Sequence, residues 1–523
     1  MAKAAKLIRR AKVRNRSLLW HVRHRAAQAL GLLVALYVLA WAWLVLDRPN
    51  PSVNYVVKVN SAAAAVAPEQ RAWPLYREAI VRIRGRELPL DELEVSTIDG
   101  EQRMPRPGEP GWDRVVAFLD EHGELLALCR QASHRTGMGL QVGHDDGFTP
   151  EDAEALGVTS GRAPASKQEE LLFRSLIGVL LPQLGPMRSL ARIVVLDLRV
   201  AAAAGDGPRV LADLRSLWMM AEHVDETPFL INGLVGLSIR ALTLKALGDV
   251  LRDQSAALTD EQWRDVAHTV ASLPRTLPLQ GERWFWDDTM QRIYGRHGHV
   301  TADGLRFLTA VSTVNGQQSS AWGSHALQSA TLPIAAAAIA PRSAMQSEYD
   351  RLMAMVESRS HLPLWRMLRE PSEVDRVFRE EYRSLPTRVR YLPIMLLMPS
   401  LDAAYRPVWF AIAQRDALQA AIAVELFHRA SGRYPEGWTE IVPGYLPAEP
   451  VDHSTELPLL MRVVDGRPVL YGRGLDDDDD GGRMSDAAVK RWPRPADAGE
   501  DTDWVLWPPV VRPAAERPEA AAP

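Results

Sequence analysis

The densest group of chemically capable side chains in this sequence is an acidic run at residues 476–480, which two glycines follow. Calcium takes six to eight oxygen ligands and tolerates a flexible turn. Adjacent aspartates point in different directions, so one loop of this kind supplies two or three carboxylate ligands, and backbone carbonyls complete the shell. A bound cation would also relieve the repulsion among five like charges. The alternative is a solvated acidic turn, which is the ordinary state of a charge run.

A second acidic group lies in the aromatic segment 282–294, which contains Glu282, Asp287 and Asp288. Glu282 and Asp287 are five residues apart and diverge on a helix, so they do not form an obvious acid–base pair. An amphipathic helix with an acidic face is the better interpretation of this segment.

Two histidine-containing groups are weaker candidates for metal ligation. His297 and His299 are imidazoles of the kind that suits zinc, but no third ligand stands at a recognisable spacing from them. The same holds for His144, Asp145 and Asp146. Neither group predicts a metal site from the sequence.

The single cysteine, Cys129, excludes an intrachain disulfide. It lies in an apolar helical pattern at residues 125–130, which predicts a small buried side chain rather than a catalytic thiol. The sequence contains no phosphate-binding loop, His-Glu-x-x-His, Cys-x-x-Cys or Gly-x-Ser-x-Gly motif. These absences favour a protein that is not an enzyme, although a catalytic triad is defined by geometry and needs no fixed motif.

The elements that must position these residues are mainly α-helical. Residues 71–130 read as helices, and residues 169–253 form the strongest helical block. Within that block Leu172, Leu176, Leu180 and Leu184 recur four apart, and further helices are expected at 188–204, 210–224 and 229–251. Short turns between consecutive helices imply antiparallel neighbours.

The C-terminal third has a different character. An alanine-rich helix at 411–430 ends before Gly432-Arg433-Tyr434-Pro435, and the apolar runs 459–464 and 468–471 flank Asp465-Gly466. An Asp-Gly pair between two such runs predicts a β-hairpin. A small α+β module is therefore expected after the long helix.

The order of these motifs resembles the C-terminal region of type II secretion major pseudopilins. In that family an alanine-rich helix precedes a Gly-x-Tyr-Pro turn, here Gly432–Pro435. The later segments Tyr445-Leu446-Pro447, Pro450-Val451-Asp452 and 470–482 are similar to the family's remaining motifs. The sequence departs from the pattern at His453 and has no pilin-type leader, so the resemblance implies a pilin-like module on a different body.

That resemblance also implies a ligand set, because a calcium ion occupies the corresponding loop of the major pseudopilins. Carried over to this sequence, the implied ligands are Asp476, Asp479 and Asp480. Over its whole length the chain also resembles uncharacterised bacterial membrane-anchored proteins, through the same tail and through Ala72-Trp73-Pro74-Leu75-Tyr76. That second resemblance implies no activity.

The N-terminal region predicts a membrane anchor. Residues 26–46 contain no charged side chain, and residues 1–25 contain nine basic residues and no acidic one. About 20 apolar residues span a bilayer as a helix, and basic flanks stay in the cytoplasm. A cleaved signal peptide, with its site at Ala40-Trp41-Ala42, is a weaker alternative because the apolar run continues to Leu46. A buried helix is weaker still, since the run is apolar on all sides.

The charge balance excludes a nucleic-acid surface. The net charge is −4, but outside the basic tail 52 basic residues face 65 acidic ones. Nucleic-acid binding requires a basic face, so no nucleic-acid partner is expected. The tail itself is better placed to contact anionic lipid beside the membrane span.

The sequence therefore predicts a mainly α protein of the bacterial inner membrane, with a cytoplasmic N-terminus and an extracytoplasmic bulk. The expected parts are a basic tail at 1–25, a transmembrane helix at 26–46, a linker at 47–70, an α-helical domain at 71–400 with a long loop near 136–168, a long helix plus the pilin-like module at 401–507, and a disordered tail at 508–523.

Three functions fit this organisation. The first is a non-enzymatic envelope protein, acting as a scaffold or secretion accessory, with the lipid bilayer and other envelope proteins as partners. The second is a membrane-tethered hydrolase with a carboxylate or metal site in the helical domain, in which Glu282, Asp287 or His297 would converge in a pocket. The third is a calcium-dependent binding module. No other cofactor is predicted.

Overall fold

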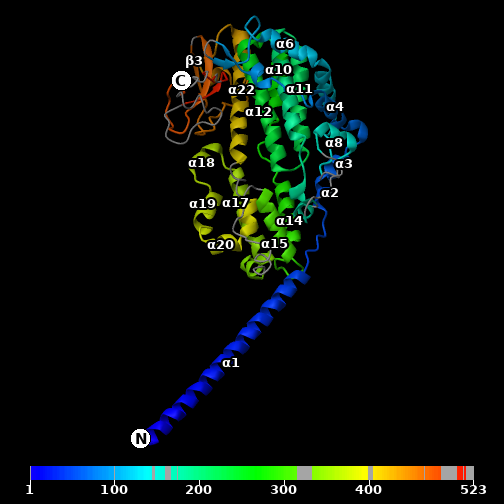
Figure 1. Cartoon of the computed structure of the whole chain (residues 1–523). Coiled ribbons are helices and arrows are strands. Elements are labelled where there is room, and N and C mark those ends of the chain that lie inside the picture. The colour runs from blue at the N-terminus through cyan, green and yellow to red at the C-terminus, as the bar shows by residue number, and fades with distance from the viewer. Residues whose placement is uncertain are drawn as a thin grey trace, which may run out of the picture.

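The structure is a computed structural model that describes residues 2–98, 101–143, 148–158, 167–173, 175–314, 333–398, 404–464, 466–484, 503–509 and 512–513. These residues are mainly helical. A long N-terminal helix leaves one end of an elongated helical body, and a small antiparallel sheet lies beside the body toward its opposite end (Figure 1).

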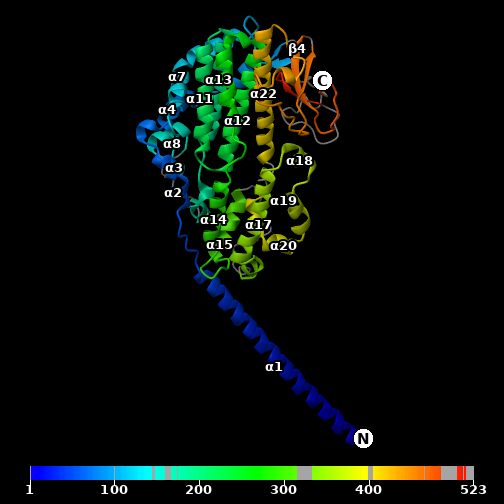
Figure 2. The ribbon, with the colours of Figure 1, turned by 180° about the vertical axis from the view of Figure 1, so that it is seen from behind.

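The N-terminal helix α1 (Ala2–Leu46) projects away from the body in both views (Figures 1 and 2). Within Trp20–Leu46, an 18-residue window has a mean hydropathy of 2.4 and is 6% buried, so the helix is long and apolar enough to cross a membrane. The helix continues back through the basic residues of the tail, since alanine, lysine and arginine all favour helices.

The centre of the body is a group of long helices, α10 (Leu184–Ala203), α11 (Gly207–Asp225), α12 (Leu230–Asp253) and α22 (Tyr405–Ser431). The three helices expected at 188–204, 210–224 and 229–251 are confirmed as α10, α11 and α12. Helix α12 is also apolar enough to be a membrane span, but it is 56% buried and packs against α10, α11 and α22. Its composition is that of a core helix.

Two groups of helices complete the body. The first lies around α4 (Trp73–Ile83), which packs on α7 (Gly123–Ala132). The second forms a separate core in which the stacked rings of Trp286 and Tyr349 lie 4.1 Å apart and to which Leu44 of α1 contributes.

The remaining α-helices are α2 (Tyr55–Val59), α3 (Ser61–Ala65), α5 (Leu90–Glu94), α6 (Trp112–Glu121), α8 (Pro150–Leu156), α9 (Lys167–Phe173), α13 (Asp260–Ala271), α14 (Gln280–Ile293), α15 (Ala302–Val314), α17 (Arg342–Ser360), α18 (Leu364–Arg369), α19 (Glu373–Arg376), α20 (Leu385–Arg390) and α21 (Leu392–Leu397).

Two small sheets lie beside this body. Strands β3 (Leu460–Val464) and β4 (Arg467–Gly472) form the expected hairpin, and β5 (Trp504–Trp507) pairs with β4. The second sheet joins β1 (Ser96–Ile98) and β2 (Glu101–Arg103) to β6 (Arg512–Pro513). The sequence did not predict this second sheet, because its strands are two or three residues long and β6 lies far along the chain from β1 and β2.

Three local expectations differ from the structure. The leucines at 172–184 do not form one helix: α9 ends at Phe173, a 3-10 turn follows at Leu176–Gly178, and α10 begins at Leu184. Pro182 would lack the amide that a helix interior requires. The expected linker at 47–70 contains α2 and α3, and the expected long loop near 136–168 contains α8.

The expected disordered tail at 508–523 lies only partly within the described residues. Pro509 and β6 contact the body, and residues 510–511 and 514–523 lie outside the part of the chain that the structure describes.

Candidate functional site

The acidic loop follows β4 and brings three carboxylates together. One oxygen each from Asp476, Asp478 and Asp480 lies within 4.8 Å of the other two. Oxygen atoms that bind one calcium ion at 2.3–2.6 Å are at most about 5 Å apart, so this spacing fits the ion. The group contains two of the three expected ligands, Asp476 and Asp480.

Asp479, the third expected ligand, has a different environment. Its Oδ1 accepts hydrogen bonds from the Tyr471 hydroxyl at 3.0 Å and from the Gly481 amide at 2.9 Å. Alternate residues of the loop, 476, 478 and 480, share one side, and Asp479 turns toward β4. The assignment of Asp479 as a ligand stays a prediction.

A buried carboxylate lies beneath this loop. Asp503 is fully buried, its Oδ2 accepts a hydrogen bond from the Gly482 amide at 2.7 Å, and its Oδ1 has no partner among the described residues. Burial, together with the nearby charges of Asp479, Asp480 and Asp476, raises the pKa of Asp503 to about 6. The loop therefore concentrates negative charge beyond its three converging aspartates.

Arg369 at the end of α18 supplies a positive charge to the edge of the acidic loop. Its guanidinium pairs with the Asp477 carboxylate and donates to the Ser454 carbonyl at 2.6 Å. These contacts join the C-terminal module to the lower helices of the body.

The three residues of the hydrolase hypothesis lie in different surroundings. Glu282 accepts a hydrogen bond from the Leu230 amide at 3.1 Å, and Asp287 is hydrogen-bonded to Tyr55. Both carboxyl groups have a raised pKa, chiefly because of burial. His297 lies beyond the far end of α14, about 16 Å along the helix from Glu282 at 1.5 Å per residue. The length of α14 therefore keeps His297 apart from Glu282.

The histidines at 297 and 299 are exposed and contact the outer end of α1. The ring of His299 lies 5.3 Å from that of Trp43, and Nδ1 of His297 is 3.7 Å from a carboxylate oxygen of Asp47. Among the described residues, the only converging group of three metal-ligating side chains is the one in the acidic loop. The other candidate group, His144-Asp145-Asp146, lies outside the described residues.

Cys129 is confirmed as a buried thiol. It is fully buried in the core around α7, and burial raises its pKa to about 12. A thiol with so high a pKa is protonated at neutral pH and is a poor nucleophile.

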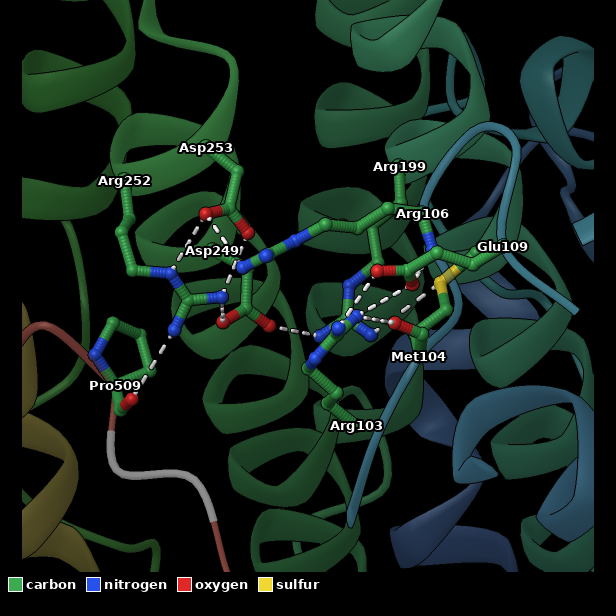
Figure 3. A network of polar contacts seen from close by, with 9 residues as sticks. All are labelled: Arg103, Met104, Arg106, Glu109, Arg199, Asp249, Arg252, Asp253 and Pro509. Carbon is green, nitrogen blue, oxygen red and sulfur yellow. Dashed lines mark hydrogen bonds and ion pairs between the residues drawn. The ribbon is translucent and has the colours of Figure 1, made fainter. Parts of the chain in front are cut away.

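A cleft of about 80 Å³ lies where β2, α10 and α12 meet, and the sequence did not predict it. Its walls carry the network of charged side chains drawn in Figure 3. Arg199 pairs with Asp249, Arg252 pairs with Asp249 at 3.1 Å and with Asp253 at 2.8 Å, and Arg106 reaches Asp253 at 2.9 Å.

The same network joins segments that are far apart in sequence. Arg103 and Glu109 form two hydrogen bonds of 2.7 Å, which hold the pKa of Glu109 down at about 2. Arg252 also donates to the Pro509 carbonyl at 3.3 Å. The arginines and carboxylates of three segments pair with one another, and the Pro509 carbonyl joins a fourth segment, so the arrangement is an ionic clasp. Its members are up to 406 residues apart in sequence, and no local pattern marks them.

A second polar cluster is buried between α7, α10 and α11. Asp197 and Asp213 are both fully buried, and Arg130 contacts both of them, at 2.8 Å in the case of Asp213. Arg209 binds Asp197 as well. Burial and the neighbouring charge of Asp197 raise the pKa of Asp213 well above its usual range, and its Oδ2 has no partner among the described residues.

Comparison with protein families, with curated proteins and with solved structures finds no match to this chain. The function is therefore argued from the geometry, and the resemblance to pseudopilins stays a prediction.

We predict that Asp249→Ala destabilises the protein, because Arg199 and Arg252 both lose a carboxylate partner. The expected loss is about 1–3 kcal/mol in the free energy of unfolding, measured by urea denaturation of the full chain in detergent. The control is Asp265→Ala on an exposed face of α13, which should change the value by less than about 0.5 kcal/mol. Equal stabilities of Asp249→Ala and its control would contradict the clasp.

We predict that Asp213 makes the stability fall as pH rises. The folded protein holds the Asp213 proton more tightly than the unfolded chain does, so stability declines between the ordinary pKa of 3.8 and the raised value. Asp213→Asn keeps a neutral side chain of the same size and should flatten this decline. Melting temperatures of both proteins between pH 5 and pH 8 measure the slopes; parallel slopes would refute the assignment.

Proposed function

We propose that this protein is a non-enzymatic envelope protein that α1 anchors in the bacterial inner membrane. In this proposal the N-terminus is cytoplasmic, and the helical body lies on the extracytoplasmic side as a scaffold or secretion accessory. The observation that carries the proposal is the uncharged run at residues 26–46, within a helix whose most apolar 18-residue window is only 6% buried. A helix of this kind is stable in lipid and costly to expose to water.

The junction of the anchor and the body supports this arrangement. Leu44 is buried in the lower core, Pro49 pairs with Gly295, and α1 contacts α15. The basic residues of the tail favour the cytoplasmic side for the N-terminus.

The chemistry of the body supports a binding or structural role. The ionic clasp around Asp249 and the buried cluster around Asp197 are occupied by their own arginine and carboxylate partners. Of the hydrolase residues, Glu282 and Asp287 have partners on other elements and His297 lies beyond the end of α14. Other envelope proteins are the partners that a scaffold of this kind would bind.

We predict that the full chain stays in bacterial membranes after washing with alkaline carbonate. The double variant Leu32→Arg and Leu36→Arg should be released, because each charge near the bilayer centre costs about 2.5–3.5 kcal/mol. The matched control places the same charges on the body, at the exposed residues Val57 and Val81. Immunoblots of pellet and supernatant measure the distribution.

Release of the unaltered chain without detergent would refute the anchor. Protease digestion of spheroplasts tests the orientation: the body should be cut and the N-terminal tail protected. Crosslinking in intact membranes tests the scaffold role, and recovery of the chain without any stable protein partner would count against it.

A second candidate function is a calcium-dependent binding module. The specific observation that favours it is the convergence of oxygens from Asp476, Asp478 and Asp480 beside the buried Asp503. The oxygen donors and their spacing fit calcium, which would supply positive charge to the loop and order it.

We predict that calcium raises the melting temperature of the full chain in detergent, because a ligand that binds only the folded state stabilises it. The triple variant Asp476→Asn, Asp478→Asn and Asp480→Asn should lose the shift. The control Asp260→Asn, Glu261→Gln and Asp265→Asn removes the same charge from α13 and should keep the calcium-dependent shift in melting temperature. Asp479→Asn distinguishes the ligand set expected from the sequence, which includes Asp479, from the set that converges in the structure, which does not. If calcium does not change the melting temperature of the unaltered chain, the calcium-dependent module is refuted.

A further inference from the structure

Helix α1 emerges from the lower end of the body (Figures 1 and 2), and the segments around this point are rich in basic residues. We define the basal face as residue 48 and residues 295–299, 341–343 and 384–390. These residues include five arginines and two histidines but no acidic residue. The chain outside its N-terminal tail is otherwise strongly acidic, so positive charge is concentrated here.

Backbone and ring contacts place these segments together around the outer end of α1. Pro49 pairs with Gly295, and His299 lies against Trp43. The Arg342 amide donates to the Gly298 carbonyl at 2.9 Å. The Ala340 amide in turn donates to the Arg390 carbonyl at 2.8 Å, which brings α20 into the same group.

The arginines of the basal face are exposed and form no ion pair with the described acidic residues. They are Arg48, Arg296, Arg342, Arg388 and Arg390. Of the nearby acids, Asp303 pairs with Arg306, and Asp47, whose side chain is 6% exposed, lies 3.7 Å from Nδ1 of His297.

Exposed apolar side chains accompany this charge. Leu385 at the start of α20 is 73% exposed, and Ile334, in the helical turn before Ala340, is 66% exposed. Trp43 lies on the last turns of α1 and is 43% exposed. Basic residues mixed with aliphatic and aromatic side chains are typical of surfaces that lie on lipid headgroups.

We propose that the basal face docks on anionic phospholipid headgroups of the leaflet into which the outer end of α1 passes. The proposal rests on the anchor proposed above and adds a second, lipid-specific contact to it. Charge complementarity selects anionic lipid, and continuity with α1 holds the face at the bilayer surface. The arginines bind phosphate, and Leu385 and Ile334 enter the headgroup layer.

The test uses the full chain in nanodiscs of neutral phosphatidylcholine, with or without anionic phosphatidylglycerol. Hydrogen exchange of peptides that cover residues 295–299 and 384–390 is the measurement. Hydrogen exchange should be slower in the anionic discs by a factor of at least about five. This factor corresponds to the stabilisation that one basic side chain gains near an anionic surface. Salt at about 1 M, where the Debye length is about 3 Å, should remove the difference.

A charge-matched pair of variants makes the test specific. Arg342→Gln, Arg388→Gln and Arg390→Gln together should remove the lipid-dependent protection. The control Arg84→Gln, Arg86→Gln and Arg114→Gln removes the same charge outside the basal face and should keep the lipid-dependent protection. All of these residues are exposed, and equal melting temperatures check that both variants fold.

The outcomes separate this proposal from the anchor itself. Failure of the chain to enter either kind of nanodisc overturns the anchor. If the chain enters both kinds of nanodisc and residues 295–299 and 384–390 show equal hydrogen exchange in them, the lipid proposal for the basal face is overturned and the anchor is not. If hydrogen exchange is equal in the two nanodiscs and the segments are protected only in native membranes, the basal face binds an envelope protein. This outcome also overturns the lipid proposal.

Discussion

The burial of α12 among α10, α11 and α22 is the interaction on which the other parts of the body depend. Apolar side chains cover nearly every side of α12, so removal of any neighbour would expose core surface to water. The C-terminal turn of the same helix carries Asp249, Arg252 and Asp253 of the ionic clasp. Helix α22 then connects this core to β5, which places the C-terminal module beside the body.

Charge is arranged in three distinct ways in this protein. In the clasp and around Asp197, guanidinium and carboxylate groups neutralise one another within the fold. In the acidic loop, carboxylates converge, and Arg369 pairs with Asp477 at the edge of the loop. On the basal face, arginines are exposed without described acidic partners. The first arrangement stabilises the fold, whereas the third leaves charge available to an external surface.

The sequence predicted the elements that local patterns determine. Helical periodicity located α10, α11 and α12, and Asp465-Gly466 located the β3–β4 hairpin. The clasp and the β1–β2–β6 sheet could not be predicted, since their partners are far apart in sequence and meet only in the folded chain. The acidic loop was predicted as a region, but the orientation of Asp478 and Asp479 depends on the turn that follows β4.

Leu44 packs in the lower core and Pro49 pairs with Gly295, so α1 and the body have little freedom to move relative to each other. A protein joined to its membrane by a long flexible tether can sample a deep volume above the bilayer. In the proposed anchored arrangement, the body would keep a fixed distance from the bilayer. The partners that it meets most often would then be proteins of the same membrane.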